Sequence, residues 1–109
     1  MTLMLLATFL APPMAVPTLP SADSITIARL QYEGGGDWYA NPSSLPNLLA
    51  AIRERTGVSV ARQEINLKPL DPGLHDHPYL YMTGHGDVRF SVAERAALRE
   101  YLISGGFLH

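Results

Sequence analysis

The sequence predicts one α/β domain built on a parallel β-sheet, and three observations support this. Short β-branched or apolar segments alternate with longer segments of helical periodicity, in the order β-α-β-β-α-β. Residues 25–30 are almost continuously apolar, which is typical of a strand covered on both faces. Glycine-rich turns follow two of the expected strands. The 109 residues suffice for about one small domain.

The first half of the domain is expected to contain two strands and one helix. A strand is expected over residues 24–32, followed by a loop over residues 33–42. Ser43 or Ser44 can cap the next helix, and Gly57 is expected to end it. A second strand is expected over residues 58–62, with an extension towards residue 65. The apolar stripe of the helix consists of Leu45, Leu48, Leu49 and Ile52.

The second half begins with a connection, because residues 67–78 hold three prolines and a glycine. A third strand over residues 79–83 and a tight turn over residues 84–86 precede a helix that runs to about residue 104. Residues 107–109 are expected to begin a fourth strand. The helix opens with a capping box formed by Ser91 and Glu94, and its buried stripe is Ala97, Leu98, Tyr101 and Leu102.

Two arrangements fit this order of elements. If the Pro-rich connection replaces a crossover helix, the strands form a parallel sheet with the first strand between the second and the third. The alternative is a split βαβ arrangement, as in ferredoxin-like folds, with antiparallel strand pairs.

Residues 1–24 are interpreted as a signal peptide and a Pro-rich tether. The apolar run over residues 3–11 is too short to cross a bilayer, which needs about 20 residues, but it suits the core of a secretory signal. No Lys or Arg precedes the run, so a buried N-terminal element in a cytoplasmic protein stays open as the alternative. Under the first interpretation the protein is periplasmic or extracellular, and residues 25–109 form the folded part.

Composition excludes several classes of function. Eight Lys and Arg residues against ten Asp and Glu residues give a net charge of -2, which excludes an overall polybasic nucleic-acid-binding protein. The sequence has no cysteine, so disulfides, cysteine-ligated zinc sites and thiol nucleophiles are excluded as well.

Three segments resemble a known bacterial family: ARLQYEGGGDWYANPSSLPNLLAAI, PYLYMTGHGDVRFS and ALREYLISGGFL. Over residues 25–108 the chain resembles the family catalogued as domain of unknown function 4159, which is similar to the class I glutamine-amidotransferase-like and ThuA-like group. The resemblance implies a flavodoxin-like three-layer parallel sheet, here incomplete with about four strands and two helices. It also implies export or attachment to membrane proteins, but no reaction.

Family members continue beyond the GGFL strand into an acidic loop and further strands. We therefore expect this chain to be the front part of a flavodoxin-like domain in a longer protein, with any later site residues absent from it.

Two loops are expected to meet at the carboxyl ends of the first and third strands. These strands are neighbours in the strand order 2-1-3-4, which places residues 34–39 beside residues 83–86 and predicts the main concave site there. A carboxylate beside two aromatic rings can stack on a sugar and bind its hydroxyl groups. The predicted ligand-binding residues are Gly34, Gly35, Gly36, Asp37, Trp38, Tyr39, Thr83, Gly84 and His85.

Each part of this site also has a simpler interpretation. Trp38 and Tyr39 can instead cover the edge of the sheet. The backbone N–H groups of residues 34–36 can approach an anion, but their spacing matches neither GxGxxG nor a P-loop.

His85 and Asp37 are the candidate catalytic pair. An exposed imidazole can transfer protons at neutral pH, and a carboxylate can orient it. The sequence has neither a GxSxG motif nor a cysteine, so no nucleophile is evident and glutamine amidotransferase activity is disfavoured. The alternative is that His85 only ties the two loops together.

A zinc site formed by His75 and His77, with His85 as a third ligand, needs a strand geometry that a Pro-rich loop does not assure. We therefore predict no metal and no cofactor. The leading interpretation is an exported domain that binds a small molecule, with carbohydrate as the candidate ligand. The alternatives are a ThuA-like hydrolase using His85 and Asp37, and an assembly domain that docks on a partner or on itself through the truncated sheet. No nucleic-acid partner and no membrane span are expected.

Overall fold

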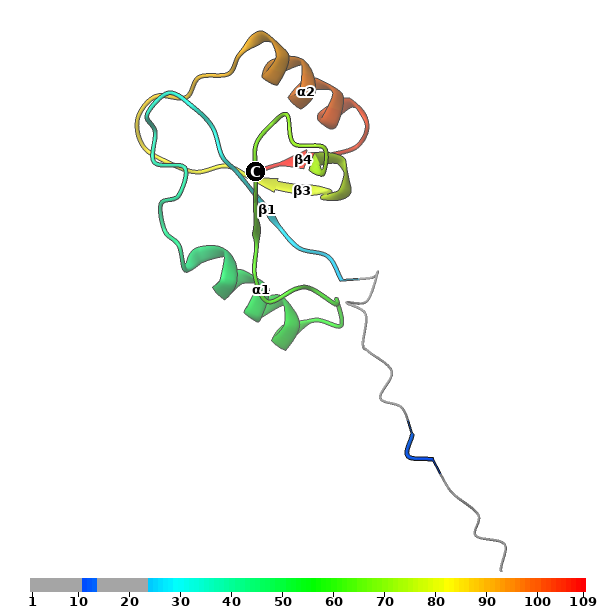
Figure 1. Ribbon diagram of the computed structural model, residues 1–109. Helices are drawn as coiled ribbons and strands as arrows, with labels where there is room; N and C mark the ends of the chain where they lie inside the picture. The colour runs from blue at the N-terminus through cyan, green and yellow to red at the C-terminus, as the bar shows by residue number, and fades with distance from the viewer. Residues whose placement is uncertain (1–10, 14–23) are drawn as a thin grey trace, which may run out of the picture.

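The computed structural model describes residues 11–13 and 24–109, and it contains a four-stranded sheet with a helix on each side (Figure 1). The strand order is β2-β1-β3-β4. All three strand pairs in this part of the chain are parallel, so the predicted α/β class is confirmed and the split βαβ alternative is wrong. The elements are β1 (Ala28–Leu30), α1 (Ser44–Arg55), β2 (Ile65–Leu67), a 3-10 helix (Leu74–Asp76), β3 (Tyr79–Tyr81), α2 (Val92–Ile103) and β4 (Phe107–Leu108).

The central strand β1 is buried on both faces, as its apolar sequence predicted. Ala28 and Leu30 are fully buried, and Arg29 between them is 2% exposed. Side chains alternate along a strand, so the two faces build two separate cores. The core on the side of α2 consists of Ala28, Leu30, Leu67, Leu74, Leu80, Leu98 and Tyr101. The smaller core on the side of α1 consists of Ile27, Leu45 and Leu49.

The helix α2 follows its predicted start closely. The Ser91 hydroxyl accepts from the Glu94 N–H and the Glu94 carboxylate accepts from the Ser91 N–H, which together form the predicted capping box. Tyr101 is buried, its hydroxyl donates to the His77 carbonyl at 2.8 Å, and burial raises the pKa of this phenol. Leu102 is 46% exposed, so its expected place in the buried stripe is wrong.

The helix α1 buries only part of its apolar stripe. Leu45 and Leu49 are buried, whereas Leu48 is 41% exposed. Ser43 occupies the N-cap position, but its side chain makes no capping hydrogen bond. At the other end the helix stops at Thr56, whose backbone is extended (φ -135°, ψ 167°), rather than through Gly57.

The second strand lies further along the chain than predicted. Val60 forms only an isolated bridge with Ile25, whereas Ala28 pairs with Ile65. From the bridge to this pair, β1 advances three residues and its neighbour five. The two additional residues form a bulge, in which the Gln63 carbonyl accepts from the Thr26 hydroxyl. The β-branched residues at 58–60 therefore lie beside the sheet rather than in β2.

Strands β1 and β3 are also shorter than predicted, since β1 begins only at Ala28 and ends at Leu30, and β3 ends at Tyr81. The predicted signal peptide and tether over residues 1–24 lie almost entirely outside the described residues. Of that segment, residues 11–13 and 24 are described, and they are exposed.

Among the helices that the structure describes, none combines the length and hydropathy needed to cross a bilayer.

We expect Gly106→Ala to lower the free energy of unfolding by about 1–3 kcal/mol, the usual cost of overpacking. A Cβ at Gly106 would overlap the ring of Tyr101, which is 2% exposed and anchored by its hydroxyl. Urea denaturation measures the difference.

The control is Gly57→Ala, because nothing within the described chain lies within 4 Å of a Cβ built there. Equal unfolding free energies for the two variants would contradict the packing argument.

Candidate functional site

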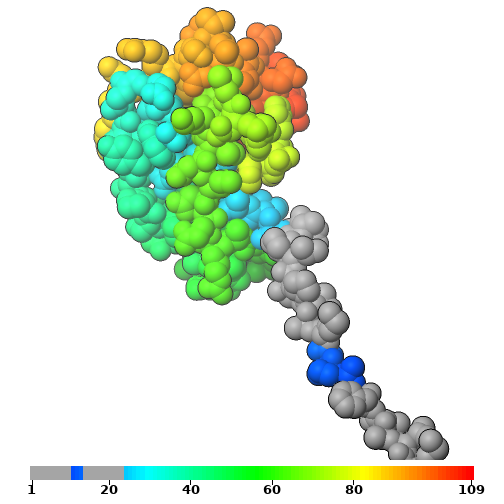
Figure 2. All heavy atoms as spheres, in the orientation of Figure 1, coloured from blue at the N-terminus to red at the C-terminus, as the bar shows by residue number. Residues whose placement is uncertain are grey.

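The loops that follow β1 and β3 lie side by side at one end of the sheet, coloured cyan and yellow to orange in Figure 2. The Gly36 N–H donates to the Asp87 carbonyl at 2.9 Å. The Asp37 N–H donates to the His85 carbonyl at 3.1 Å. The predicted meeting of the two loops is therefore confirmed, and it is made by main-chain bonds.

Tyr32 lies beneath this junction, and its position explains why residue 84 is a glycine. Its side chain is 4% exposed, and its hydroxyl donates to the Thr83 carbonyl at 2.9 Å. Gly84 follows with a φ of 139°, and a Cβ there would overlap the Tyr32 hydroxyl. Gly84 thus permits the second loop to pass directly over the buried phenol.

Gly34 and Gly36 bring the first loop onto the second. A Cβ on Gly34 would lie 2.8 Å from the Arg89 nitrogen, and one on Gly36 would lie 2.8 Å from the Asp87 carbonyl oxygen. The Gly36 N–H already donates to that carbonyl. These two glycines are accounted for by backbone packing, which weakens the anion-cradle interpretation of the GGG run.

Asp37 and His85 form the polar centre of the junction. One oxygen of the Asp37 carboxylate accepts from the backbone N–H of His85, and the other lies 3.4 Å from the His85 Nδ1. The bond from the His85 N–H holds the pKa of Asp37 below its usual value. The Asp37 side chain is 36% exposed and the His85 side chain is 90% exposed, so the pair faces solvent. The structure brings the two candidate catalytic residues together.

Trp38 and Tyr39 directly follow Asp37 in the first loop. Their ring centroids are 5.6 Å apart in an edge-to-face arrangement with an interplanar angle of 87°. Trp38 is half-buried, whereas Tyr39 is 64% exposed. Tyr39 therefore offers the larger free surface, although the sequence alone does not distinguish the two rings.

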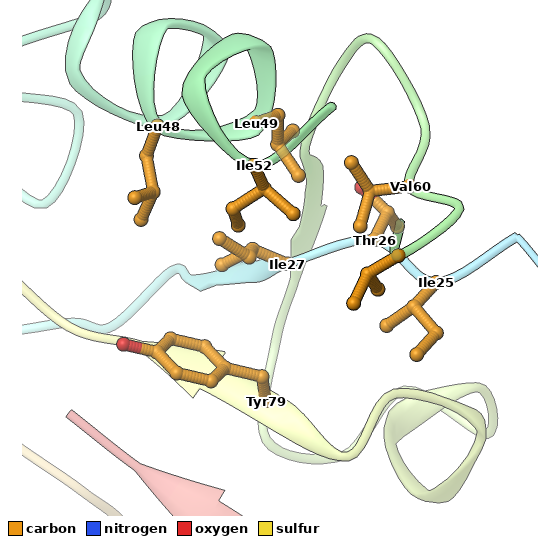
Figure 3. A pocket seen from close by; sticks show the side chains of 9 residues that line it. Ile25, Thr26, Ile27, Leu48, Leu49, Ile52, Val60 and Tyr79 are labelled. Atoms are coloured by element: carbon orange, nitrogen blue, oxygen red, sulfur yellow. The ribbon is translucent and has the colours of Figure 1, made fainter. Parts of the chain in front are cut away.

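Two hollows in the described structure lie away from these loops, so they give no support to the prediction that the loops form the main concave site. One, of about 390 Å³, lies between α1 and the sheet, and Figure 3 shows side chains of α1 above Ile27 and Tyr79. This hollow exists because the rest of the domain does not fully cover the apolar stripe of α1, in which Leu48 is 41% exposed. It is lined by Ile25, Thr26, Ile27, Leu48, Leu49, Ile52, Val58, Val60 and Tyr79.

The histidines considered for zinc lie in separate surroundings. His75 is in the 3-10 helix, with its Nδ1 3.4 Å from the Ser104 hydroxyl, whereas His85 is paired with Asp37. Within residues 11–13 and 24–109, no three His, Cys, Asp or Glu side chains are grouped closely enough to bind a metal ion.

Arg29 is a site neighbour that the sequence analysis missed. It lies in the middle of β1, and its Nη1 donates to the Ala40 carbonyl at 2.9 Å. The sequence did contain a signal for this role: Arg29 is a charged residue inside an apolar strand, and a buried charge requires a partner.

We expect Asp37→Asn to weaken the dependence of stability on acid pH. The lowered pKa of Asp37 means that its stabilising contribution is complete above the ordinary aspartate pKa of about 3.9 and disappears as the pH falls through the lower native value. An amide does not titrate, so the variant should lose less stability on acidification. Urea denaturation between about pH 3 and pH 7 measures this.

Asp76→Asn, at an exposed position of the 3-10 helix, is the control for removing one carboxylate. Identical pH profiles for wild-type protein and Asp37→Asn would show that the His85 N–H does not stabilise the charged carboxylate.

The comparison with protein families agrees with the resemblance to domain of unknown function 4159. A search of curated proteins found no match. Residues 26–109 match the family described as Domain of unknown function (DUF4159). This match spans both strand-end loops and every strand and helix of the sheet. The chain therefore belongs to the DUF4159 family.

Proposed function

We propose that this domain binds a carbohydrate at the strand-end surface formed by residues 34–39 and 83–85. One observation carries the proposal: a solvent-facing carboxylate, held by the main chain of His85, belongs to the same loop as Tyr39, which follows it by two residues and has a ring that is 64% exposed. Saccharides combine a weakly polar ring face with peripheral hydroxyl groups, so they match an aromatic ring flanked by hydrogen-bonding groups.

The polar groups have complementary roles in this proposal. The carboxylate oxygen of Asp37 that does not bond to the His85 N–H accepts from a sugar hydroxyl. The imidazole of His85, whose side chain is 90% exposed, offers a further polar atom. The loop bonds fix the Asp37 backbone before any ligand arrives. Binding therefore needs little ordering of the loop, which reduces its entropic cost.

We expect Tyr39→Ala to weaken saccharide binding by about tenfold, because one stacked ring is lost. Trp38→Ala should also weaken binding, through the lost edge-to-face support of Tyr39. Isothermal titration calorimetry with cello-, chito- and xylo-oligosaccharides provides the measurement.

Phe107→Ala is the matched control, since it removes a ring that is 57% exposed on β4. The proposal is overturned if wild-type protein binds none of the three saccharide series, or if all three variants bind as the wild type does.

A hydrolase of the glutamine-amidotransferase-like and ThuA-like group is the second candidate. It is supported by the 3.4 Å approach of the Asp37 carboxylate to the His85 Nδ1, which orients the imidazole to activate a water molecule. In that case His85→Ala removes hydrolysis of a bound saccharide while Tyr39-dependent binding persists.

An assembly role is the third candidate, supported by exposed apolar residues at one edge of the molecule. Phe107 on β4 is 57% exposed, and Ile103 at the end of α2 is 70% exposed. Sedimentation velocity over a range of concentrations tests this role, and a monomer throughout would exclude self-association.

We also propose that the protein is exported, on the basis of the uncharged apolar run over residues 3–11. Mass spectrometry of secreted protein should show that the N-terminal segment up to about residue 22 has been removed. Leu6→Arg, which interrupts the run, should block export, whereas Thr18→Arg should not. An exported, folded product that retains Met1 would contradict cleavage of a signal peptide.

A further inference from the structure

We propose that Arg29 is a positioning residue that fixes the Trp38–Tyr39 segment of the site from beneath. Its Nη1 donates to the Ala40 carbonyl at 2.9 Å and lies 3.5 Å from the Trp38 carbonyl oxygen. These two carbonyls flank Tyr39 in sequence. The guanidinium thus holds the main chain on both sides of Tyr39, whose own ring is 64% exposed.

The burial of Arg29 shows that the contact is not incidental. The side chain is 2% exposed, and a buried guanidinium is costly unless it is paired and hydrogen-bonded. Its neighbours on the sheet compensate only in part, since the Glu64 carboxylate is 3.8 Å from Nη2 and the Tyr81 ring centroid is 5.7 Å from the guanidinium carbon. Among the described residues, Nη2 itself has no hydrogen-bond partner. The best hydrogen bond of this charged group therefore goes to the loop.

The position of Arg29 also connects the loop to the sheet. Arg29 pairs with Asn66 of β2 and Tyr81 of β3, so the base of its side chain is fixed by strands on both sides. The planar guanidinium can reach two acceptors at once, which a lysine ammonium does with less directional control. Asp37 is held by His85 and Ala40 by Arg29, and in sequence the two aromatic residues lie between these anchors.

Intrinsic fluorescence tests this inference, because Trp38 is the one tryptophan in the sequence. Arg29→Met removes the guanidinium and keeps a long apolar side chain in the core. We expect the acrylamide quenching constant of Trp38 to at least double in this variant, measured well below its melting temperature. Arg29→Lys, which keeps the charge but not the planar group, should give an intermediate value.

Leu80→Ala is the control for lost stability, since Leu80 is fully buried in the core on the side of α2. It should lower the melting temperature and leave Trp38 quenching as in the wild type. A folded Arg29→Met protein with wild-type quenching would overturn the proposal, because Arg29 would then serve the core alone.

If Arg29→Met does not fold, the wild-type protein decides the question. The guanidinium hydrogens of Arg29, followed by ¹⁵N NMR, should exchange with water at least tenfold more slowly than those of Arg55, which is exposed at the end of α1. Equal exchange rates would overturn the proposal.

The consequence for ligands rests on the proposed function: Arg29→Lys should weaken saccharide binding although Arg29 does not face solvent. The quenching and exchange measurements need no ligand. If no saccharide binds, the proposed function fails while the positioning role of Arg29 is still decided.

Discussion

The three-residue strand β1 must pair on both sides and be covered on both faces, and the rest of the structure depends on this constraint. Ala28 and Leu30 direct their side chains to the core beneath α2, which forces Ile27 and Arg29 to the side of α1. Each of these positions buries an apolar side chain except Arg29, which buries a charged one. A charge inside the central strand needs acceptors nearby, and the loop that leaves β1 supplies them. The strand therefore determines both where the loop begins and how its distal part is held.

The same loop is fixed from its other side by the loop after β3. Parallel pairing of β1 with β3 brings their carboxyl ends together, and glycines at 34, 36 and 84 remove the side chains that would keep the two backbones apart. The glycines thus serve the frame of the site. Asp37, Tyr39 and His85 are the side chains that this frame presents to solvent. Of the amides in the glycine run, that of Gly36 is already bonded to the Asp87 carbonyl.

Sequence patterns predicted the features that depend on local or topological rules. The capping box at Ser91 is local, and the meeting of the two loops follows from strand order alone. The position of β2 could not be predicted in this way, because it depends on a bulge between the Val60 bridge and the Ile65 pair. The hollow was missed for a similar reason: the pattern shows that Leu48 belongs to an apolar stripe, but not that α1 leaves it partly uncovered.

The apolar hollow and the strand-end surface differ in the ligands they can distinguish. The hydroxyls that line the hollow are already engaged, Thr26 with the Gln63 carbonyl and Tyr79 with the His109 ring at 2.7 Å. A polar ligand entering there would lose its hydrogen bonds to water without replacing them. At the strand-end surface, by contrast, the side chains of Asp37 and His85 are accessible, and the ring of Tyr39 in the same loop is exposed. The proposed binding of a hydroxylated molecule therefore fits the strand-end surface better than the hollow, and the loop bonds reduce the entropic cost of such binding.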